Sequence, residues 1–269
     1  MFEMLISYGP KLLDGAIMTL KLTFIAVAIA LLLSLPLAML RRSKKGLFQY
    51  PVRLYVSFFR GTPLLAQLFL VYYGSGQFRP ELMEAGLWWF FRDPFYCALF
   101  TFALNSTAYQ IEILRGALQA VPPGEVEAGV AMGMSPHLLY RKIILPHTYR
   151  IAFPALGNEI ILMLKGGAIA SVITLLDLMG QTRRAFSQTF DISVYVWAAL
   201  IYLLITTLFV LVWRRIEHRL TRHLRLNIVS RPASSQADTR PATQQPSMQQ
   251  TTTSATAQPL QAKEATHVR

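Results

Sequence analysis

Apolar blocks dominate this sequence, and they are too long and too continuous for the interior of a soluble domain. A membrane-spanning α-helix needs roughly 20 mostly apolar residues, because the hydrocarbon core of a bilayer is about 30 Å thick. Five blocks meet this requirement, and they cover residues 16–40, 52–74, 95–114, 153–176 and 192–213. Only 15% of the residues are charged, against about a quarter in a typical soluble domain. The sequence therefore predicts an all-α integral membrane protein with about five transmembrane helices.

Basic residues gather in alternate connections between these blocks. Residues 41–53, residues 115–152 and the stretch RRIEHRLTRHLR after Trp213 are basic, whereas the other connections balance their charges. Basic connections stay in the cytoplasm, so we expect a periplasmic N-terminus and a cytoplasmic C-terminus. This pattern also explains the net charge of +12 without a nucleic-acid partner. The start of the chain lacks a basic region and a cleavage site, so the first block is predicted to be retained in the bilayer.

The composition changes near residue 230. Residues 230–269 are rich in Ser, Thr, Gln, Ala and Pro and contain few large apolar residues. Such a segment buries too little apolar surface to offset the entropy lost on ordering. We therefore expect a transmembrane domain over residues 1–229 and a disordered cytoplasmic tail over residues 230–269.

Motifs for catalysis and nucleotide binding are absent from the sequence. It has no Gly-x-x-x-x-Gly-Lys-[Ser/Thr] phosphate loop, no Gly-x-Ser-x-Gly and no His-Glu-x-x-His. The spacings of the five histidines do not make a metal pair on one helix face. We expect no catalytic residue, cofactor or metal in this chain. If the chain moves a solute uphill, the energy has to come from a partner or an ion gradient.

The cytoplasmic connection over residues 116–152 is predicted to form two short helices. Pro122-Pro123-Gly124 ends the preceding helix, and the acidic residues that follow favour a helix N-terminus. Gly133 suits a helix end in the left-handed region. Ser135 and Pro136 suit the N-cap and first residue of a second helix, which is predicted to end before Pro146. An amphipathic loop on the membrane surface is the alternative interpretation.

This connection resembles the EAA loop of ABC-importer permeases. That loop has Glu-Ala-Ala, three residues, Gly, nine residues and Ile-x-Leu-Pro. The chain has Glu127-Ala128-Gly129, then Gly133, then Ile143-Ile144-Leu145-Pro146, and only Gly129 departs from the pattern. Flanking segments such as FRGTPLLAQLFLVYYGSGQF and LPHTYRIAFPALGNEIILMLK are similar to the polar amino-acid branch of these permeases, which includes histidine/arginine and opine uptake systems. The resemblance covers residues 2–225.

The resemblance implies an ABC type I importer permease fold, in which two permease subunits, identical or paralogous, line a path across the bacterial inner membrane. A periplasmic substrate-binding protein would deliver substrate, and a cytoplasmic ATP-binding-cassette ATPase would bind ATP. The EAA loop would dock in a groove on this ATPase. The residues that the resemblance places at this contact are Glu127, Ala128, Gly129, Gly133, Ser135, Ile143, Leu145 and Pro146.

Polar residues within the apolar blocks are candidates for the substrate pathway, because ionisable groups in lipid are costly and usually face a bundle interior. At the second block Arg60 precedes Gly61-Thr62-Pro63, where Pro63 must break or kink the helix. Broken helices are tolerated against protein or a water-filled cavity, so Arg60 and Thr62 are predicted to line the path. The alternative is that the second span begins near Thr62 and Arg60 lies at the cytoplasmic interface.

The third and fourth blocks carry Asn105 and the set Asn158, Glu159 and Lys165. Glu159 suits an ammonium or guanidinium group of a substrate, and Lys165 suits a carboxylate. The alternative is a structural network that links helices by hydrogen bonds.

The sequence is compatible with two functions. One is the permease subunit of an ATP-driven importer of polar, especially basic, amino acids or opines, which is what the resemblance implies. The other is a self-sufficient ion-coupled carrier or channel that uses Glu159 and Lys165 as its ion site. The EAA-like loop favours the first function, because a self-sufficient carrier has no need of it.

Overall fold

The architecture was analysed in a computed structural model, which describes residues 2–41 and 46–229 and the side chains of residues 6–41 and 46–220. Contacts divide the chain into one unit, Met1–Arg225, and a second, Leu226–Arg269. The predicted tail over residues 230–269 lies outside the described residues. Helices form the whole of the described architecture, and no strand occurs within it.

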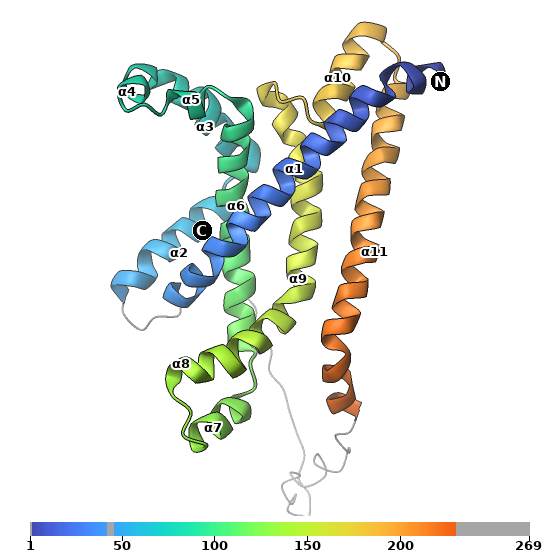
Figure 1. Cartoon of the computed structure of the whole chain (residues 1–269). Coiled ribbons are helices and arrows are strands. Elements are labelled where there is room, and N and C mark those ends of the chain that lie inside the picture. The colour runs from blue at the N-terminus through green and yellow to red at the C-terminus, as the bar shows by residue number, and fades with distance from the viewer. Residues whose placement is uncertain (1, 42–45, 230–269) are drawn as a thin grey trace, which may run out of the picture. The chain divides into compact units, whose positions relative to one another are not determined.

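Helix α1 (Phe2–Arg41) crosses α6 (Pro94–Gln119) and α9 (Leu145–Gly166) at the centre of the bundle (Figure 1). Small residues let these helices approach closely, as is common in membranes. Ala26, Ala98 and the larger Phe102 are fully buried in their shared core. Cys97 is buried in the same cluster, as expected for a small apolar side chain. The centre of the bundle is therefore packed by alanines together with larger aliphatic side chains and the Phe102 ring.

The second apolar block is broken, as predicted. Helix α2 (Gly46–Gly61) and helix α3 (Leu64–Gln77) meet at an angle of 101°. Pro63 lies at the break in an extended conformation, because it has no N–H to continue the α2 ladder. Two short helices, α4 (Arg79–Glu84) and α5 (Trp88–Phe91), then lead into α6.

The cytoplasmic connection forms α7 (Pro123–Ala131) and α8 (Pro136–Leu139), as predicted in type and order. The prediction that the second helix ends before Pro146 is wrong. A π-helical segment, Tyr140–Ile144, joins α8 to α9 without interruption. The Leu145 N–H bonds to the carbonyl of Tyr140, five residues back. This wider turn sits directly before Pro146, whose ring would otherwise crowd the carbonyl four residues earlier.

After α9 a 3₁₀ segment, Gly167–Ile173, leads to α10 (Leu178–Thr189) and then to α11 (Ser193–Val229). Asp177 caps α10, because its carboxylate accepts a hydrogen bond of 2.8 Å from the N–H of Gly180. The N–H of Leu178 in turn donates to the Thr19 hydroxyl on α1, at 3.1 Å. These bonds fix α10 against the N-terminal half of α1.

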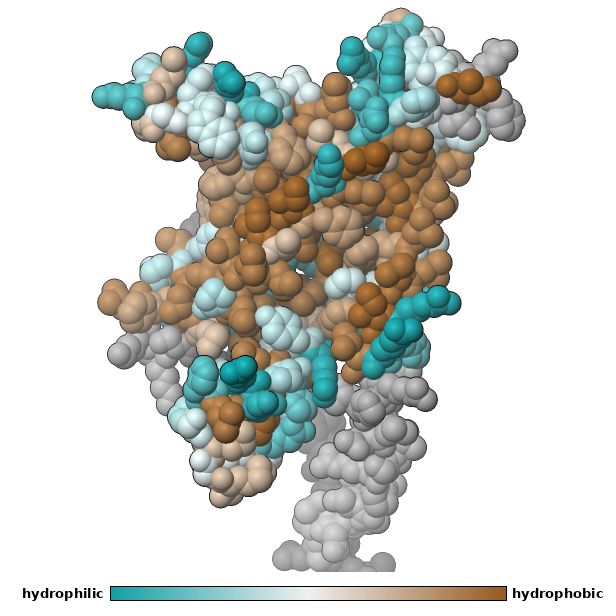
Figure 2. All heavy atoms as spheres, in the orientation of Figure 1, coloured by the Kyte–Doolittle hydropathy of each residue, from teal (hydrophilic) through white to brown (hydrophobic). Residues whose placement is uncertain are grey.

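Three stretches of the described chain are long and apolar enough to cross a membrane: Ile6–Arg41, Pro136–Ile173 and Ser193–Leu220. The bent α2–α3 pair is a fourth candidate if its two helices are counted as one span. Helix α6, the predicted third span, is not among them, since four polar residues lower its hydropathy: Asn105, Ser106, Thr107 and Gln110. It is nevertheless central to the bundle (Figure 1). Figure 2 shows an apolar band between two hydrophilic ends, as a multi-pass membrane protein requires.

Candidate functional site: a cytoplasmic loop and two intramembrane polar networks

The α7–α8 turn is held by a specific set of backbone hydrogen bonds. The N–H of Met134 donates to the carbonyl of Gly129 at 3.1 Å, and that of Gly133 donates to Val130 at 2.9 Å. This is the Schellman arrangement, which needs a left-handed residue after the helix. Gly133 supplies it with a φ of +73°. Ser135 then caps α8 by accepting a hydrogen bond from the N–H of Leu138 at 3.4 Å. Gly133 therefore ends α7 and Ser135 begins α8, as predicted.

Gly129, the one departure from the EAA pattern, lies on α7 and is buried where α7 packs against the segments that follow. A Cβ at this position would lie 2.5 Å from Leu139 Cδ1 and 2.9 Å from Ile143 Cδ1. The larger side chains of Leu139 and Ile143 thus occupy the space that an alanine methyl would need. Glycine fits this loop because α7 packs unusually close to the α8–π segment.

The outer surface of the loop is apolar for a cytoplasmic connection. Val130 and Met132 are 59% and 73% exposed, and Glu127 and Ala128 are exposed beside them. Contiguous exposed apolar side chains rimmed by polar residues often mark a protein-binding surface. By contrast, three of the predicted contact residues, Ile143, Leu145 and Pro146, are partly buried. They support the loop more than they face outward.

A contact between His147 and Glu125 ties the loop to α9. His147 Nε2 lies 3.0 Å from Glu125 Oε2, at the start of α7, and His147 Nδ1 lies 3.0 Å from the carbonyl of Ile143. Because α8, the π segment and α9 are continuous, the loop and α9 are connected both through the backbone and through this side-chain contact.

The first intramembrane network closes the break in the second span. In an unbroken helix the carbonyl of Phe59 would accept from residue 63, but Pro63 has no N–H. Two side-chain amides replace that donor: Gln67 Nε2 at 2.9 Å and Asn105 Nδ2 at 3.1 Å. Gln67 Oε1 also accepts a hydrogen bond of 2.9 Å from Asn105 Nδ2. Gln67 Nε2 donates to the Thr62 hydroxyl at 2.8 Å. Asn105 and Thr62 therefore stabilise the break.

The second network links three helices around Glu159. Ser106 donates to Glu159 Oε1 at 3.2 Å, Gln110 donates to Ser106 at 3.1 Å, and Ser34 donates to Gln110 at 3.4 Å. All four side chains are buried, and they come from α1, α6 and α9. One Glu159 oxygen is thus bonded by the protein at the centre of the bundle.

The other residues predicted to line the substrate path do not gather around the Glu159 carboxylate. Arg60 is exposed, and its guanidinium lies 5.3 Å from the centre of the Tyr109 ring. Asn158 and Lys165 are exposed. Lys165 lies six residues beyond Glu159 on one helix, which turns it about 240° away. Glu159 and Lys165 therefore lie on different faces of α9.

Gln67 and Gln110 belong to these networks, and sequence reasoning missed both. Each is a glutamine inside an otherwise apolar stretch, which was the available signal, because polar side chains in a span usually bond across helices. A third group, Glu112, is shared by Arg41 at 2.6 Å and Arg115 at 2.9 Å. It connects the ends of α1 and α6 and lies away from Glu159.

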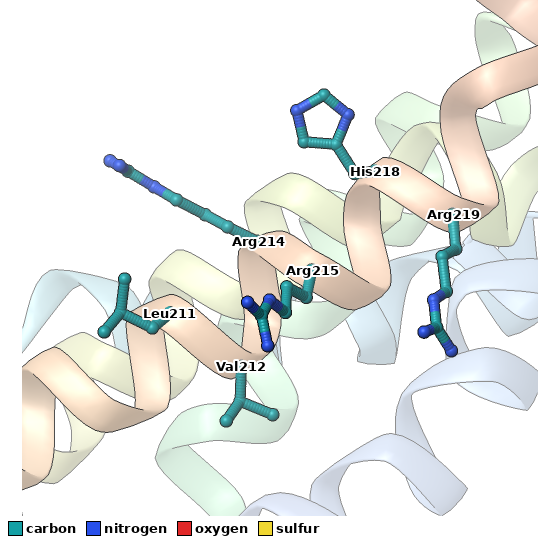
Figure 3. A pocket seen from close by; sticks show the side chains of 6 residues that line it. All are labelled: Leu211, Val212, Arg214, Arg215, His218 and Arg219. Atoms are coloured by element: carbon teal, nitrogen blue, oxygen red, sulfur yellow. The ribbon is translucent and has the colours of Figure 1, made fainter.

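A hollow of about 640 Å³ lies along the end of α11, and six α11 residues line it: Leu211, Val212, Arg214, Arg215, His218 and Arg219. Figure 3 shows these side chains leaving the helix in different directions. Groups that diverge from one helix do not form a substrate pocket. No cluster of three metal-ligating side chains occurs among the described residues either.

A bundle of membrane-crossing helices with a broken span is the architecture of a multi-pass membrane protein. The family of binding-protein-dependent transport system inner membrane components matches residues 27–225. The chain belongs to this family, whose members are permeases of ABC transporters.

Similar proteins and structures agree with this assignment. The nopaline transport system permease protein NocM of Agrobacterium fabrum is 43% identical over 76% of this chain and 85% of its own length. The arginine ABC transporter permease protein ArtM of Escherichia coli is 36% identical over 81% and 96%. A crystal structure of an amino acid ABC transporter with histidines matches 81% of this chain and 98% of that chain, with 38% identity and a TM-score of 0.72.

Proposed function

We propose that this chain is the permease subunit of an ABC importer that moves polar, especially basic, amino acids or opines across a bacterial inner membrane. Similarity to permeases named for nopaline and arginine transport supports the substrate class. The proposal includes a separate cytoplasmic ATPase, a second permease subunit and a periplasmic binding protein as partners, and no catalytic residue in this chain.

The observation that carries the proposal is the exposed apolar surface of the α7–α8 loop, formed by Val130 and Met132 with Glu127 and Ala128. An apolar surface on a cytoplasmic loop is unfavourable unless a partner covers it. In this proposal the ATPase groove covers it, and Gly133 and Ser135 hold the loop in the shape that docks.

The continuous helix from Pro136 to Gly166 gives a mechanical route from this loop into the membrane. When the ATPases close on ATP, they displace α7 and α8. The π segment and the His147–Glu125 contact carry the displacement into α9. Glu159 lies on α9 and bonds to Ser106 on α6, so the displacement changes the relation between the two helices that hold the central network.

We further propose that the substrate path passes along Arg60, Asn158, Glu159 and Lys165, with Thr62 and Asn105 shaping the broken span beside it. Among the described residues, Glu159 accepts a side-chain hydrogen bond on one of its two oxygens, so its carboxylate has remaining acceptor capacity for a cationic group. The guanidinium of arginine is a planar donor that suits such a carboxylate.

The experiment is uptake into proteoliposomes that contain this permease, its ATPase and its binding protein. Unlabelled arginine, histidine, lysine, ornithine, glutamine and opines compete against a labelled amino acid, which identifies the substrate. ATP-dependent uptake that is inhibited by basic amino acids or opines is expected. Uptake that persists in vesicles without any ATPase would instead support an ion-coupled carrier.

A further inference from the structure

A basic cavity of about 360 Å³ lies where α1, α2 and α6 meet, and it is lined by Arg41, Gln49, Arg53, Arg115 and Gln119. Three of these five residues are arginines and the other two are amides, so every lining side chain offers N–H donors. The cavity is therefore built for an anion.

The charges in the cavity are only partly compensated. Glu112 pairs with Arg41 and Arg115, which leaves one carboxylate for two guanidinium groups. No carboxylate lies within ion-pair distance of Arg53 among the described residues. Arg41 also has a buried Nη1 without a hydrogen-bond partner in the described part of the chain. An arriving anion finds unused donors here, and unpaired buried donors are costly unless they are satisfied.

The cavity adjoins an exposed apolar surface on α2. Leu47, Tyr50 and Leu54 are 81%, 70% and 63% exposed, and their spacing puts them on one face of the helix. Gln49 and Arg53 lie on a neighbouring face, between this apolar face and the buried residues Val52 and Val56. An amphiphile therefore fits better than a free anion, since its charged end would occupy the cavity while its chains lie along α2.

The cavity lies at the membrane boundary. Arg41 is the last residue of α1, and Arg115 and Gln119 belong to the final turns of α6, directly before the cytoplasmic loop. Basic pockets between transmembrane helices on the cytoplasmic side are suited to anionic lipid head groups. We propose that this cavity binds the phosphate group of an anionic phospholipid, with Arg53 as its free cationic ligand.

Native mass spectrometry of the full-length permease in its assembled transporter tests this, with phosphatidylglycerol as the probe and phosphatidylcholine as the neutral lipid. We expect saturable retention of phosphatidylglycerol that is weakened about fivefold by Arg53→Gln, the effect typical of one basic residue near an anionic membrane surface. Arg184→Gln removes the same charge from an exposed site on α10 and should leave retention unchanged. Arg53 forms no described ion pair, so its substitution leaves the Glu112 contacts intact.

Three outcomes would overturn the proposal. Equal retention of the two lipids would show that the cavity does not recognise the anionic group. An equal loss in Arg53→Gln and Arg184→Gln would show an effect of net charge alone. Inorganic phosphate that displaces the lipid at an equal concentration would identify a site for a soluble anion rather than a phospholipid. The proposal does not depend on the transported substrate, and lipid retention is measured without uptake.

Discussion

A substitution at Gly157 provides a sharp test of how α11 is attached to the bundle. The indole of Trp213 lies directly over Gly157, and an added Cβ would overlap Trp213 Nε1. The ring has little room to move, because it stacks on Phe153 with centroids 4.3 Å apart and on Phe209 with centroids 5.4 Å apart. Its N–H also donates to the carbonyl of Phe153 at 3.2 Å. We therefore expect Gly157→Ala to displace the Trp213 side chain.

The magnitude follows from what the displaced ring loses. A hydrogen bond contributes about 1 kcal/mol, and each aromatic pair contributes about 1 kcal/mol beyond its buried area. Alanine recovers about 1 kcal/mol through its higher helix propensity. The net loss in the free energy of unfolding is therefore about 2 kcal/mol.

The assay is reversible denaturation in mixed micelles, combined with fluorescence of a variant in which Trp213 is the only remaining tryptophan. Displacement of the ring should shift its emission to the red. Gly116→Ala is the matched control, because a Cβ at Gly116 in α6 meets nothing within 4 Å. This control should be neutral or slightly stabilising.

A double-mutant cycle separates overlap from other effects, since residues in contact show non-additive energies. In the Trp213→Ala background the obstacle is gone, so Gly157→Ala should no longer destabilise the protein. If Gly157→Ala keeps both the wild-type stability and the wild-type emission maximum, the described packing of α9 against α11 is wrong.

Three further predictions concern other parts of the chain. Replacing Gly133, whose φ is +73°, with Val should destabilise the loop turn by about 1 kcal/mol or more and reduce co-purification with the proposed ATPase. The control Gly124→Ala should leave co-purification unchanged, because a Cβ at Gly124 meets nothing within 4 Å. Gln67→Leu should cost about 1–3 kcal/mol in unfolding free energy, because Phe59 loses one of its two amide donors; an unchanged denaturation midpoint would contradict this. Burial raises the pKa of Asp177 to about 6, so the folded state binds a proton more tightly than the unfolded state. The free energy of unfolding should therefore fall by up to about 3 kcal/mol as the pH rises from about 4 through 6. Asp177→Asn keeps a capping side chain and should remove this part of the pH dependence in thermal melts.

Local signals in the sequence predicted the features that depend on neighbouring residues. Pro63 predicted the broken span, and Gly133 with Ser135 predicted the turn between α7 and α8. Each of these residues imposes its effect through its own backbone or through a bond to a residue three to five positions away. The π segment before Pro146 escaped prediction because a proline can either end a helix or be accommodated by a wider turn, and packing of α8 and α9 decides between them.

Features that depend on the register between helices were not predictable from one sequence. Asn105 and Glu159 were identifiable as unusual residues in apolar blocks, but their partners Gln67 and Ser106 are 38 and 53 residues away. A rotation of one helix by a single residue, about 100°, would turn either side chain to a different neighbour.

The two polar networks differ in what they hold together, and this difference bears on transport. The Gln67–Asn105 network bonds a carbonyl that Pro63 leaves without a donor, so it compensates a fixed defect and has no reason to change during a transport cycle. The Ser106–Glu159 bond instead joins α6 to α9, the helix that is continuous with the cytoplasmic loop. In the proposed mechanism, movement of that loop relative to α6 stretches or reorients this bond. The first network is therefore expected to govern stability, and the second is where loop movement acts on the centre of the bundle.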